Sequence, residues 1–461
     1  MDALILLFFT GLVVMFTAML KKPQLVLAAS TIGIAASLGL VIRQIMGSSS
    51  LITWSYQGLS FDGGNLLYAA LVLFLGLLIV SGGYEAFKRE PEHTGEYISL
   101  IIFSMVGALC MIGFTDMFMF FIGLEILSIP IYVLAGTNKK DIRSTEASIK
   151  YFFTGAFATG ILLFGIALIF GATGSFELKA IHDSIIKSVS FGPLIYVGIL
   201  FILASFLFKV GAAPFHFWSP DVYSGSPTMV TGYMAAVVKL AGLFAFMKMF
   251  SFVFIGAFSF WSDLLFAVII LTMLVGNLSA LGQTKFKRLL AYSSISNAAY
   301  ALIALMVASS QTFYNLWIYL AGYGLAVIIL VTIGQMVNDS EDNISSFKGI
   351  GRRNPFIGVA LTLAILSLAG VPPLLGFLGK YMVFSSAFSA FPILVIIAVI
   401  NSGIGIYYYL RLLIVALSAN DQDDVVEIKP SLLQYLTLSV CAVLLLFGGV
   451  LDYVLNNLLG Q

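Results

Sequence analysis

Residues 200–243, LFILASFLFKVGAAPFHFWSPDVYSGSPTMVTGYMAAVVKLAGL, decide how the rest of the chain folds. They form two apolar segments with a lysine deep inside each, Lys209 in the first and Lys239 in the second. An ammonium at the centre of a membrane span costs at least ~2.5 to 3.5 kcal/mol, so such residues usually face an internal cavity and carry function. Pro214 follows Lys209 in the run Gly-Ala-Ala-Pro. Because proline removes a backbone donor and clashes with the preceding turn, we expect the first helix to break there.

The composition is that of an integral membrane protein. Of 461 residues, 60% are hydrophobic and only 10% are charged, against about 25% charged in a soluble domain. Apolar stretches of about 18 residues or more recur along the whole chain, which predicts an all-α bundle in a lipid bilayer rather than a β-barrel. A net charge of +1 gives no sign of a nucleic-acid partner.

Fourteen windows are long enough to cross a bilayer. Their ranges are 3–20, 25–46, 64–84, 96–114, 116–136, 145–170, 191–217, 227–249, 258–282, 287–308, 312–337, 355–391, 393–416 and 431–451. The window 355–391 is too long for one crossing, and Pro372 and Pro373 follow Gly370 within it. We therefore expect a second broken helix there, although fifteen crossings remain an alternative.

Basic residues indicate the orientation of these helices. Loops after even-numbered helices hold only Lys179, Lys187 and Lys248, whereas loops after odd-numbered helices hold most of the other lysines and arginines. Because cytoplasmic loops carry an excess of basic residues, the loops after odd-numbered helices are predicted to be cytoplasmic and both termini to lie outside. The loop 175–190 repeats apolar residues at helical spacing, which predicts a short amphipathic helix along that outer interface.

The two breaks predict an internal repeat. They lie five helices apart, and because five is odd, two five-helix units would be inserted upside down relative to each other. The expected division is 1–94 (three helices), 95–256 (first inverted repeat), 257–416 (second inverted repeat) and 417–461 (a loop and the last helix). Lys209 precedes its proline by five residues and Lys380 follows Pro373 by seven, so the two lysines are not equivalent under this alignment.

Four charged residues inside the spans are candidates for a proton relay. They are Glu125, Lys209, Lys239 and Lys380. Burial favours the neutral form of each group and an opposite charge favours the charged form, so a buried lysine can change its protonation as a partner approaches or leaves. We expect Glu125 and Lys209 to form a switchable pair. The alternative is a set of static ion pairs that hold the helices together.

Other polar residues are weaker candidates for the proton path. Lys150 lies near the cytoplasmic end of its helix, where it would be either a snorkelling anchor or part of the relay. His216 follows Lys209 by seven residues and would share its helical face if the helix resumes after Pro214. The polar run of the tenth helix would either hold water between the two halves or satisfy the helix backbone; its members are Ser293, Ser294, Ser296 and Asn297.

Signals for bound cofactors are missing from the sequence. The two cysteines, Cys110 and Cys441, both lie in apolar spans and have no metal or cluster spacing, so we read them as small buried hydrophobic residues. No G-x-G-x-x-G follows a strand pattern, and no second histidine or cysteine accompanies His216. We expect neither a metal nor a redox cofactor in this chain.

Three motifs resemble those of the antiporter-like membrane subunits of respiratory complex I. They are GLEILSIPIYVLAG (123–136), KVGAAPFHFWSPDVYSGSPTMVTGYMAAVVK (209–239) and SLAGVPPLLGFLGK (367–380). The resemblance covers helices four to thirteen and implies a fourteen-helix subunit with two inverted repeats and a proton channel along a central line of charges. It gives Glu125, Lys209, Lys239 and Lys380 the roles of motif acid, broken-helix lysine, central lysine and outlet-side residue.

Two features make the chain most similar to the N type of these subunits. Lys380 is a lysine where M-type relatives generally have glutamate, and no long lateral helix of the L type follows helix fourteen. In one departure, Asn297 stands where relatives often have histidine. We therefore expect water held by Asn297 and the neighbouring serines to replace a protonatable link.

The resemblance implies a proton-translocating membrane-arm subunit of an NADH:quinone oxidoreductase. FMN, iron–sulfur clusters and quinone are expected in partner subunits, and M-type antiporter-like and small K-type subunits are the expected neighbours. Alternatives are a subunit of a multi-subunit cation/proton antiporter driven by an ion gradient, or of a membrane-bound hydrogenase.

Overall fold

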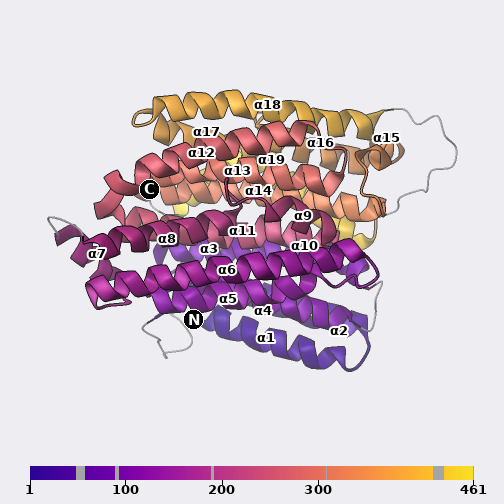
Figure 1. Ribbon diagram of the computed structural model, residues 1–461. Coiled ribbons are helices and arrows are strands. Elements are labelled where there is room, and N and C mark those ends of the chain that lie inside the picture. Colours follow the sequence, from indigo (N-terminus) through magenta and orange to yellow (C-terminus); the bar gives the residue numbers. More distant parts are fainter. Residues whose placement is uncertain (48–57, 89–92, 188–191, 308, 419–429, 460–461) are drawn as a thin grey trace.

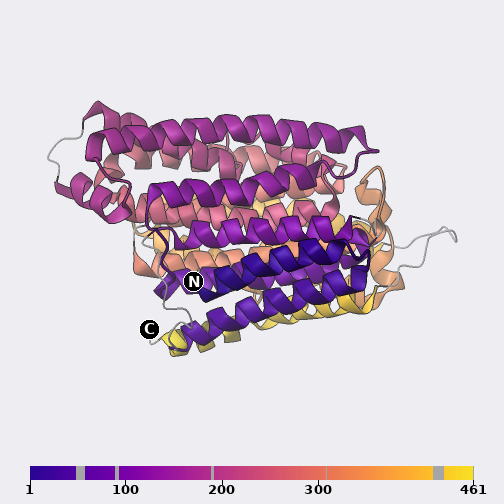
Figure 2. The ribbon, with the colours of Figure 1, turned by 90° about the horizontal axis from the view of Figure 1, so that it is seen from below.

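The chain forms a bundle of long helices aligned along one axis, with their ends at two opposite faces (Figures 1 and 2). The computed structural model describes residues 1–47, 58–88, 93–187, 192–307, 309–418 and 430–459. Within these ranges the ordered elements are helices, accompanied by three isolated β-bridges. The predicted all-α membrane architecture is confirmed.

The first nine helices lead up to the centre of the chain. They are α1 (Asp2–Ala18), α2 (Pro23–Ile45), α3 (Gly63–Phe87), α4 (Thr94–Gly113), α5 (Met117–Ala135), α6 (Ile142–Thr173), α7 (Leu178–Lys187), α8 (Pro193–Val210) and α9 (Trp218–Gly225). The sequence did not predict α9, because it is a short segment between two apolar windows.

The remaining helices start with the one that carries Lys239. They are α10 (Thr228–Tyr233), η1 (Met234–Val238), α11 (Lys239–Lys248), η2 (Met249–Val253), η3 (Ile255–Ala257), α12 (Phe258–Leu281), α13 (Phe286–Ile303), η4 (Ala304–Met306), α14 (Ser310–Val337), η5 (Ile344–Phe347), α15 (Ile350–Arg353), α16 (Pro355–Ala369), α17 (Leu375–Phe388), α18 (Pro392–Leu417) and α19 (Leu432–Leu459).

Twelve helical segments of the described chain are long and apolar enough to cross a membrane. α1 and α16 are apolar but shorter. The total of fourteen crossings therefore remains a prediction.

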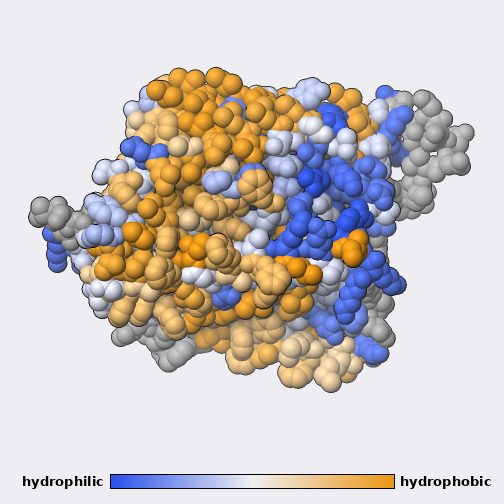
Figure 3. Space-filling model, in the orientation of Figure 1, coloured by the Kyte–Doolittle hydropathy of each residue, from blue (hydrophilic) through white to orange (hydrophobic). Residues whose placement is uncertain are grey.

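The two faces of the bundle differ in polarity. α1 begins and α19 ends at the face that carries α7, whereas α15 lies at the opposite face (Figure 1). Hydrophilic side chains gather near the α15 face, and apolar side chains cover much of the length (Figure 3). The start of α1 and the end of α19 thus share a face with α7, while the side of the membrane that this face occupies stays a prediction.

The predicted amphipathic helix is confirmed as α7. Leu178, Ile181 and Ile185 are buried against the bundle, while Lys179 and Lys187 on the opposite side are exposed. Residues 188–190 of the predicted segment lie outside the described residues. The position of α7 along a membrane interface stays a prediction.

Both predicted helix breaks are present, and their backbones follow one pattern. α8 ends at Gly211 (φ 74°) and α16 ends at Gly370 (φ 83°), the left-handed conformation that glycine adopts without a Cβ penalty. In each, the amide after the glycine donates back to the fifth residue before it, Ala212 to Leu207 O (2.8 Å) and Val371 to Leu366 O (3.0 Å). Both connections contain a cis X-Pro peptide, at Pro214 and at Pro373.

The centre of the bundle consists of α13, α14 and the helix that carries Lys239. The most apolar window of α14 is completely buried, and that of α13 is 94% buried. The Lys239 helix contains two π turns, η1 and η2, which widen its hydrogen-bond pattern to i→i+5. Lys239 is the first residue after η1, so a local change of helix type precedes the central lysine.

Candidate functional site

Lys209 lies in the last turn of α8, and its side chain crosses to α5. It is 7% exposed, and its Nζ donates a hydrogen bond to Ser128 Oγ (2.5 Å). Ser128 Oγ in turn donates to Leu124 O in its own helix. At the same helix end, Trp218 Nε1 donates to Phe208 O (3.1 Å).

Glu125 lies one turn before Ser128 and has a different partner. Its Oε1 accepts a hydrogen bond from Thr159 Oγ1 of α6 (2.9 Å), and the residue is partly exposed on the α5 and α6 side of the bundle. Among the described residues Glu125 makes no ion pair, so the predicted direct contact with Lys209 is not present in this conformation. Its charge still acts on Lys209 from a distance, and Ser128 is the residue that touches Lys209.

Lys239 is held by a neighbouring helix rather than by a carboxylate. It is 5% exposed, and its Nζ donates to Ser294 O (2.8 Å) and to Ser294 Oγ on α13. The aliphatic stem of Lys209 passes beside Gly242, where an added Cβ would lie 3.5 Å from Lys209 Cγ. Gly242 follows Lys239 by three residues, so the Lys209 stem packs on the helix that carries Lys239 within one turn of it.

Lys380 lies in α17, just beyond the second break. It is 7% exposed, and its Nζ donates to Leu368 O (2.7 Å) at the end of α16 and to Ser402 Oγ (3.1 Å) on α18. The same Nζ lies 5.1 Å from the ring centroid of Tyr300 on α13, a cation–π distance. Two neutral oxygens and one ring therefore surround this ammonium.

Tyrosines and asparagines occupy the space between Lys239 and Lys380. Ser293 Oγ is hydrogen-bonded to Tyr409 OH, and Asn297 Nδ2 donates to the same hydroxyl (3.1 Å). Tyr319 OH donates to Asn297 Oδ1 (2.9 Å). Protein hydroxyls thus bond Asn297 and Ser293 directly, and the role of Asn297 and the serines as holders of water stays a prediction.

A second chain of contacts leads toward Lys380. Tyr408 OH donates to Asn277 Oδ1 (3.0 Å), and Asn277 Nδ2 donates to Tyr300 OH (3.0 Å), whose ring faces Lys380. Ser296 Oγ donates to Ser293 O (2.9 Å), the backbone role expected as the alternative. Sequence reasoning missed Asn277 and these tyrosines, since one tyrosine among the 20 in the chain carries no positional signal.

His216 is not where the helical-spacing argument placed it. The helix resumes only at Trp218, so His216 lies within the irregular connection and shares no helical face with Lys209. It is 8% exposed, and its Nδ1 has no partner among the described protein atoms. The prediction of a shared face is wrong, because the break is a connection of seven residues, 211–217, and not a single kink.

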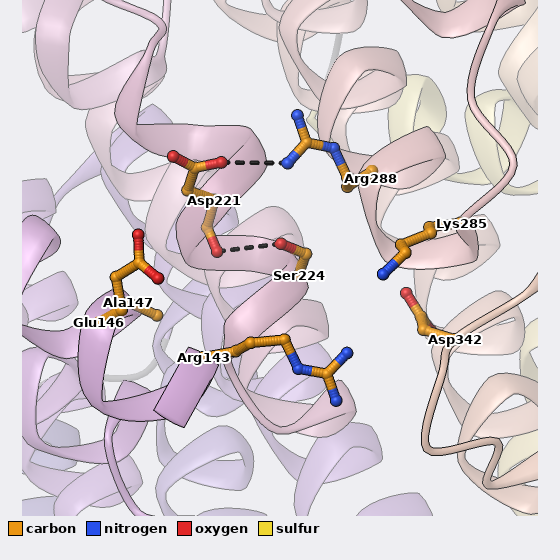
Figure 4. A pocket seen from close by; sticks show the side chains of 8 residues that line it. All are labelled: Arg143, Glu146, Ala147, Asp221, Ser224, Lys285, Arg288 and Asp342. Atoms are coloured by element: carbon orange, nitrogen blue, oxygen red, sulfur yellow. Dashed lines mark hydrogen bonds and ion pairs between the residues drawn. The ribbon is translucent and has the colours of Figure 1, made fainter. Parts of the chain in front are cut away.

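Lys150 belongs to an ion-pair network at the α15 face and not to the central line. Its Nζ lies 2.6 Å from Glu146 Oε1 and 2.7 Å from Asp221 Oδ2. Arg288 Nη1 bonds the other oxygen of Asp221 (3.0 Å), as Figure 4 shows. Burial alone would raise the pKa of Asp221, but Lys150 and Arg288 lower it below its ordinary value.

This network joins three parts of the chain, α6, α9 and the start of α13. It therefore fixes the cytoplasm-predicted ends of both proposed repeats against each other. The described residues contain no group of three His, Cys, Asp or Glu side chains arranged to hold a metal ion.

Comparisons with known proteins agree on one family. The family described as NADH:quinone oxidoreductase/Mrp antiporter, transmembrane, matches residues 115–405. A curated relative, NADH-quinone oxidoreductase subunit N of Cytophaga hutchinsonii, is 38% identical over 429 residues, 91% of each chain.

Solved structures show the same likeness. A chain in respiratory complex I from Thermus thermophilus with bound aureothin is 30% identical with a TM-score of 0.84, over 98% of this chain and 97% of that one. A chain of the Mrp complex from Dietzia sp. DQ12-45-1b has a TM-score of 0.85 over 100% of this chain and 97% of that one. At 19% identity the latter shows a likeness of fold alone.

Proposed function

The chain belongs to the NADH:quinone oxidoreductase/Mrp antiporter family of membrane proteins, and from this premise we propose that its line of buried lysines carries protons across the membrane. It is a membrane-arm subunit of an NADH-quinone oxidoreductase, as its relatives named subunit N are. Redox energy enters through other subunits, which supply FMN, iron–sulfur clusters and quinone.

One observation supports the relay above all others. The three lysines Lys209, Lys239 and Lys380 are 5–7% exposed, and none forms an ion pair with a described carboxylate. An unpaired ammonium in an apolar interior is costly, so its proton is held loosely enough to be passed on. A static framework would instead pair each lysine with an acid.

The contacts suggest an order of transfer. The Lys209 stem packs on Gly242, three residues after Lys239, so a swing of the Lys209 side chain toward that helix changes the charge near Lys239. The two tyrosine chains then lead from α13 toward Lys380, which serves as the outlet residue. Lys239 acts as the central storage site between the two repeats, 95–256 and 257–416.

Glu125 and Lys209 act as a switch in this scheme. Lys209 moves between Ser128, near Glu125, and the neighbourhood of Lys239, where two unit charges a few ångström apart repel by about 2 to 4 kcal/mol. In the assembled complex, Lys209→Arg should keep part of the pumping because it keeps the charge. The combination of Glu125→Gln and Lys209→Ala should be no worse than the worse single change, and complexes that pump normally without either charge would rule the switch out.

The membrane, the orientation and the neighbouring subunits are part of the same proposal. We place it in the bacterial inner membrane with both termini periplasmic, beside M-type antiporter-like and small K-type subunits. Cysteines introduced in α7 should then react with an impermeant thiol reagent in intact cells, and cysteines in the 338–354 loop should react only in inside-out vesicles. The opposite labelling would reverse the orientation.

The relay itself is tested by Lys239→Ala in the complete complex. NADH-driven proton uptake into inside-out vesicles should fall at least ~10-fold, a change of about 1.4 kcal/mol or more in the transfer barrier. Lys179→Ala, which removes an exposed lysine of α7, is the matched control and should pump normally. Normal pumping by an assembled Lys239→Ala complex would contradict the proposal.

A further inference from the structure

A threonine of the neighbouring helix holds the acid of the proposed switch. Thr159 lies in α6, and its Oγ1 donates a hydrogen bond to Glu125 Oε1 of α5 (2.9 Å). Both side chains are half-buried where α5 packs on α6. The carboxylate is therefore directed toward α6, and a neutral hydroxyl bonds it there.

This bond differs from those of other threonines in the same helix. Thr154 donates to Lys150 O (2.6 Å), four residues earlier in α6, and Thr173 makes the same type of bond within its own helix (2.8 Å). A helical threonine commonly bonds the carbonyl of the preceding turn in this way. Among the described residues, Thr159 makes no such bond, and its hydroxyl donates to Glu125 in a different helix. The Thr159 hydroxyl thus serves the carboxylate and not its own backbone.

A second hydroxyl holds the lysine of the switch. Lys209 Nζ donates to Ser128 Oγ (2.5 Å), and Ser128 follows Glu125 by three residues in α5. Side chains three residues apart on a helix have Cβ atoms about 5–6 Å apart. A change of side-chain rotamer can therefore bring the carboxylate to the ammonium without movement of α5. In this structure each charge is bonded to a hydroxyl, and the ion pair is open.

The backbones around this open pair are held close together. A Cβ added at Gly165 of α6 would lie 3.1 Å from Gly198 O of α8, and a Cβ added at Gly198 would lie 3.1 Å from Gly165 O. In the same way, a Cβ added at Gly107 of α4 would lie 2.2 Å from Leu127 N of α5. Small residues allow such direct packing of helices in membranes. Rotation of side chains is therefore the available way to open or close the pair.

We propose that Thr159 is a latch that keeps the pair of Glu125 and Lys209 open. While Thr159 holds the carboxylate, the ammonium of Lys209 is free to swing toward Lys239. When the carboxylate leaves Thr159, it captures that ammonium and stops the swing. The inference rests on the proposed function, in which Glu125 and Lys209 act as a switch, and adds the residue that sets its open state. Thr159 is a positioning residue, because it acts through Glu125 and carries no proton of the relay.

The reaction of Glu125 with N,N′-dicyclohexylcarbodiimide tests the latch. This reagent modifies carboxyl groups in apolar surroundings, and peptide mass spectrometry measures its addition to Glu125 in the complete complex. Thr159→Val keeps the shape of the side chain but removes the hydroxyl, so Glu125 should pair with Lys209 and be modified at least ~5-fold more slowly than in the wild type. Thr159→Ala should give the same result and serves if the valine variant does not assemble. Thr159→Ser keeps the hydroxyl and should react as the wild type does.

Two further variants show whether Lys209 causes the protection. Combining Thr159→Val with Lys209→Met should restore the wild-type rate of modification, because no ammonium remains to capture the carboxylate. Thr154→Val removes an exposed threonine hydroxyl that bonds its own helix, and it should leave the rate unchanged. The latch is overturned if Glu125 reacts at the wild-type rate in Thr159→Val, or if it stays protected when Lys209→Met is added.

NADH-driven proton pumping separates the latch from the relay. Thr159→Val should pump ~5-fold more slowly than the wild type, because the captured Lys209 no longer swings, and Thr159→Ser should pump normally. Full pumping by Thr159→Val together with an inactive Lys239→Ala would refute the latch and leave the relay standing. Normal pumping by Lys239→Ala would instead refute the relay, whereas the modification of Glu125 is measured without turnover and still decides whether Thr159 holds it.

Discussion

The two broken helices have the same backbone conformation at the break, but their lysines make different contacts. In the second break the ammonium of Lys380 turns back to Leu368 O and so caps the carbonyl end of α16. In the first break the indole of Trp218 donates to Phe208 O, which corresponds to Ser367 O of the second break and not to Leu368 O. The ammonium of Lys209 instead faces α5, where a single hydroxyl, Ser128 Oγ, accepts from it.

This difference shows that the conformation of the helix break does not by itself determine what the neighbouring lysine bonds to. The glycine and proline of each break supply the same turn, and the helix end supplies carbonyls that attract a cation. A lysine bonded to those carbonyls is fixed in place, whereas a lysine bonded to one hydroxyl of another helix can move. We therefore assign the moving part to Lys209 and the fixed outlet to Lys380.

The largest expected effect comes from removing each lysine. Lys209→Met and Lys380→Met should both lower proton pumping by at least ~10-fold, since each removes a relay site. Only Lys380→Met leaves a buried carbonyl without its donor, at a cost of about 1 to 3 kcal/mol. Thermal unfolding of the purified complexes should show the greater loss for Lys380→Met. A greater loss for Lys209→Met would reverse the assignment of the fixed and moving lysines.

Alanine in place of each glycine gives a smaller contrast. Both glycines have positive φ, so each change costs about 1 to 2 kcal/mol of stability. At Gly370 the new Cβ would lie 3.2 Å from Lys380 Cδ, whereas at Gly211 the nearest described atom, Ser219 Cβ, is 3.8 Å away. The rate of proton pumping should be ~5-fold lower in Gly370→Ala than in Gly211→Ala. Equal pumping by the two variants would show that crowding at Lys380 has no effect.

Trp218→Phe should make the first break resemble the second. The new ring can still stack on Tyr151, but Phe208 O keeps only the Gly211 amide (3.0 Å) as a donor, and we expect Lys209 to turn toward that carbonyl. The rate of pumping should fall ~3-fold, which corresponds to an increase of less than about 1 kcal/mol in the barrier to proton transfer. Trp261→Phe removes the same type of bond, to Phe254 O, away from the lysines and should leave pumping unchanged. An equal response to both changes would point to a general packing defect.

The smallest effect should come from the tyrosine chain beside the second lysine. Tyr409→Phe removes one hydroxyl that bonds Ser293 and Asn297, while Tyr408 and water can still bridge the gap, so pumping should fall only ~2-fold. Tyr407→Phe, an exposed neighbour on the same helix, is the control in the same assay. An undiminished rate in Tyr409→Phe would remove this hydroxyl from the path.

The sequence predicted those features of the fold and the site that depend on residues close to each other in the chain. Gly-Ala-Ala-Pro and Gly-Val-Pro-Pro each contain the glycine that ends the helix and the proline that cannot continue it, and a lysine within an apolar window is visible in any hydropathy reading. The amphipathic pattern of α7 was equally local. Each of these features needs no knowledge of the neighbours.

The parts that the sequence missed depend on distant residues. Ser128 is 81 positions from Lys209, and Asn277 is 131 positions from Tyr408, so only the packed bundle brings them together. Glu125 was expected to touch Lys209, but one helical turn places Ser128 there instead. The error at His216 has the same origin, because the length of an irregular connection is set by packing and not by its proline.

The central claim is that Lys239 must release the proton that it binds, and Lys239→Arg tests it most directly. Arginine keeps the positive charge and the donors but is not deprotonated in proteins. NADH-driven proton uptake should be measured in inside-out vesicles that contain equal amounts of assembled wild-type or Lys239→Arg complex. The account predicts that the arginine variant assembles and loses nearly all pumping. Pumping at the wild-type rate would show that Lys239 contributes only a fixed charge, and would contradict the relay.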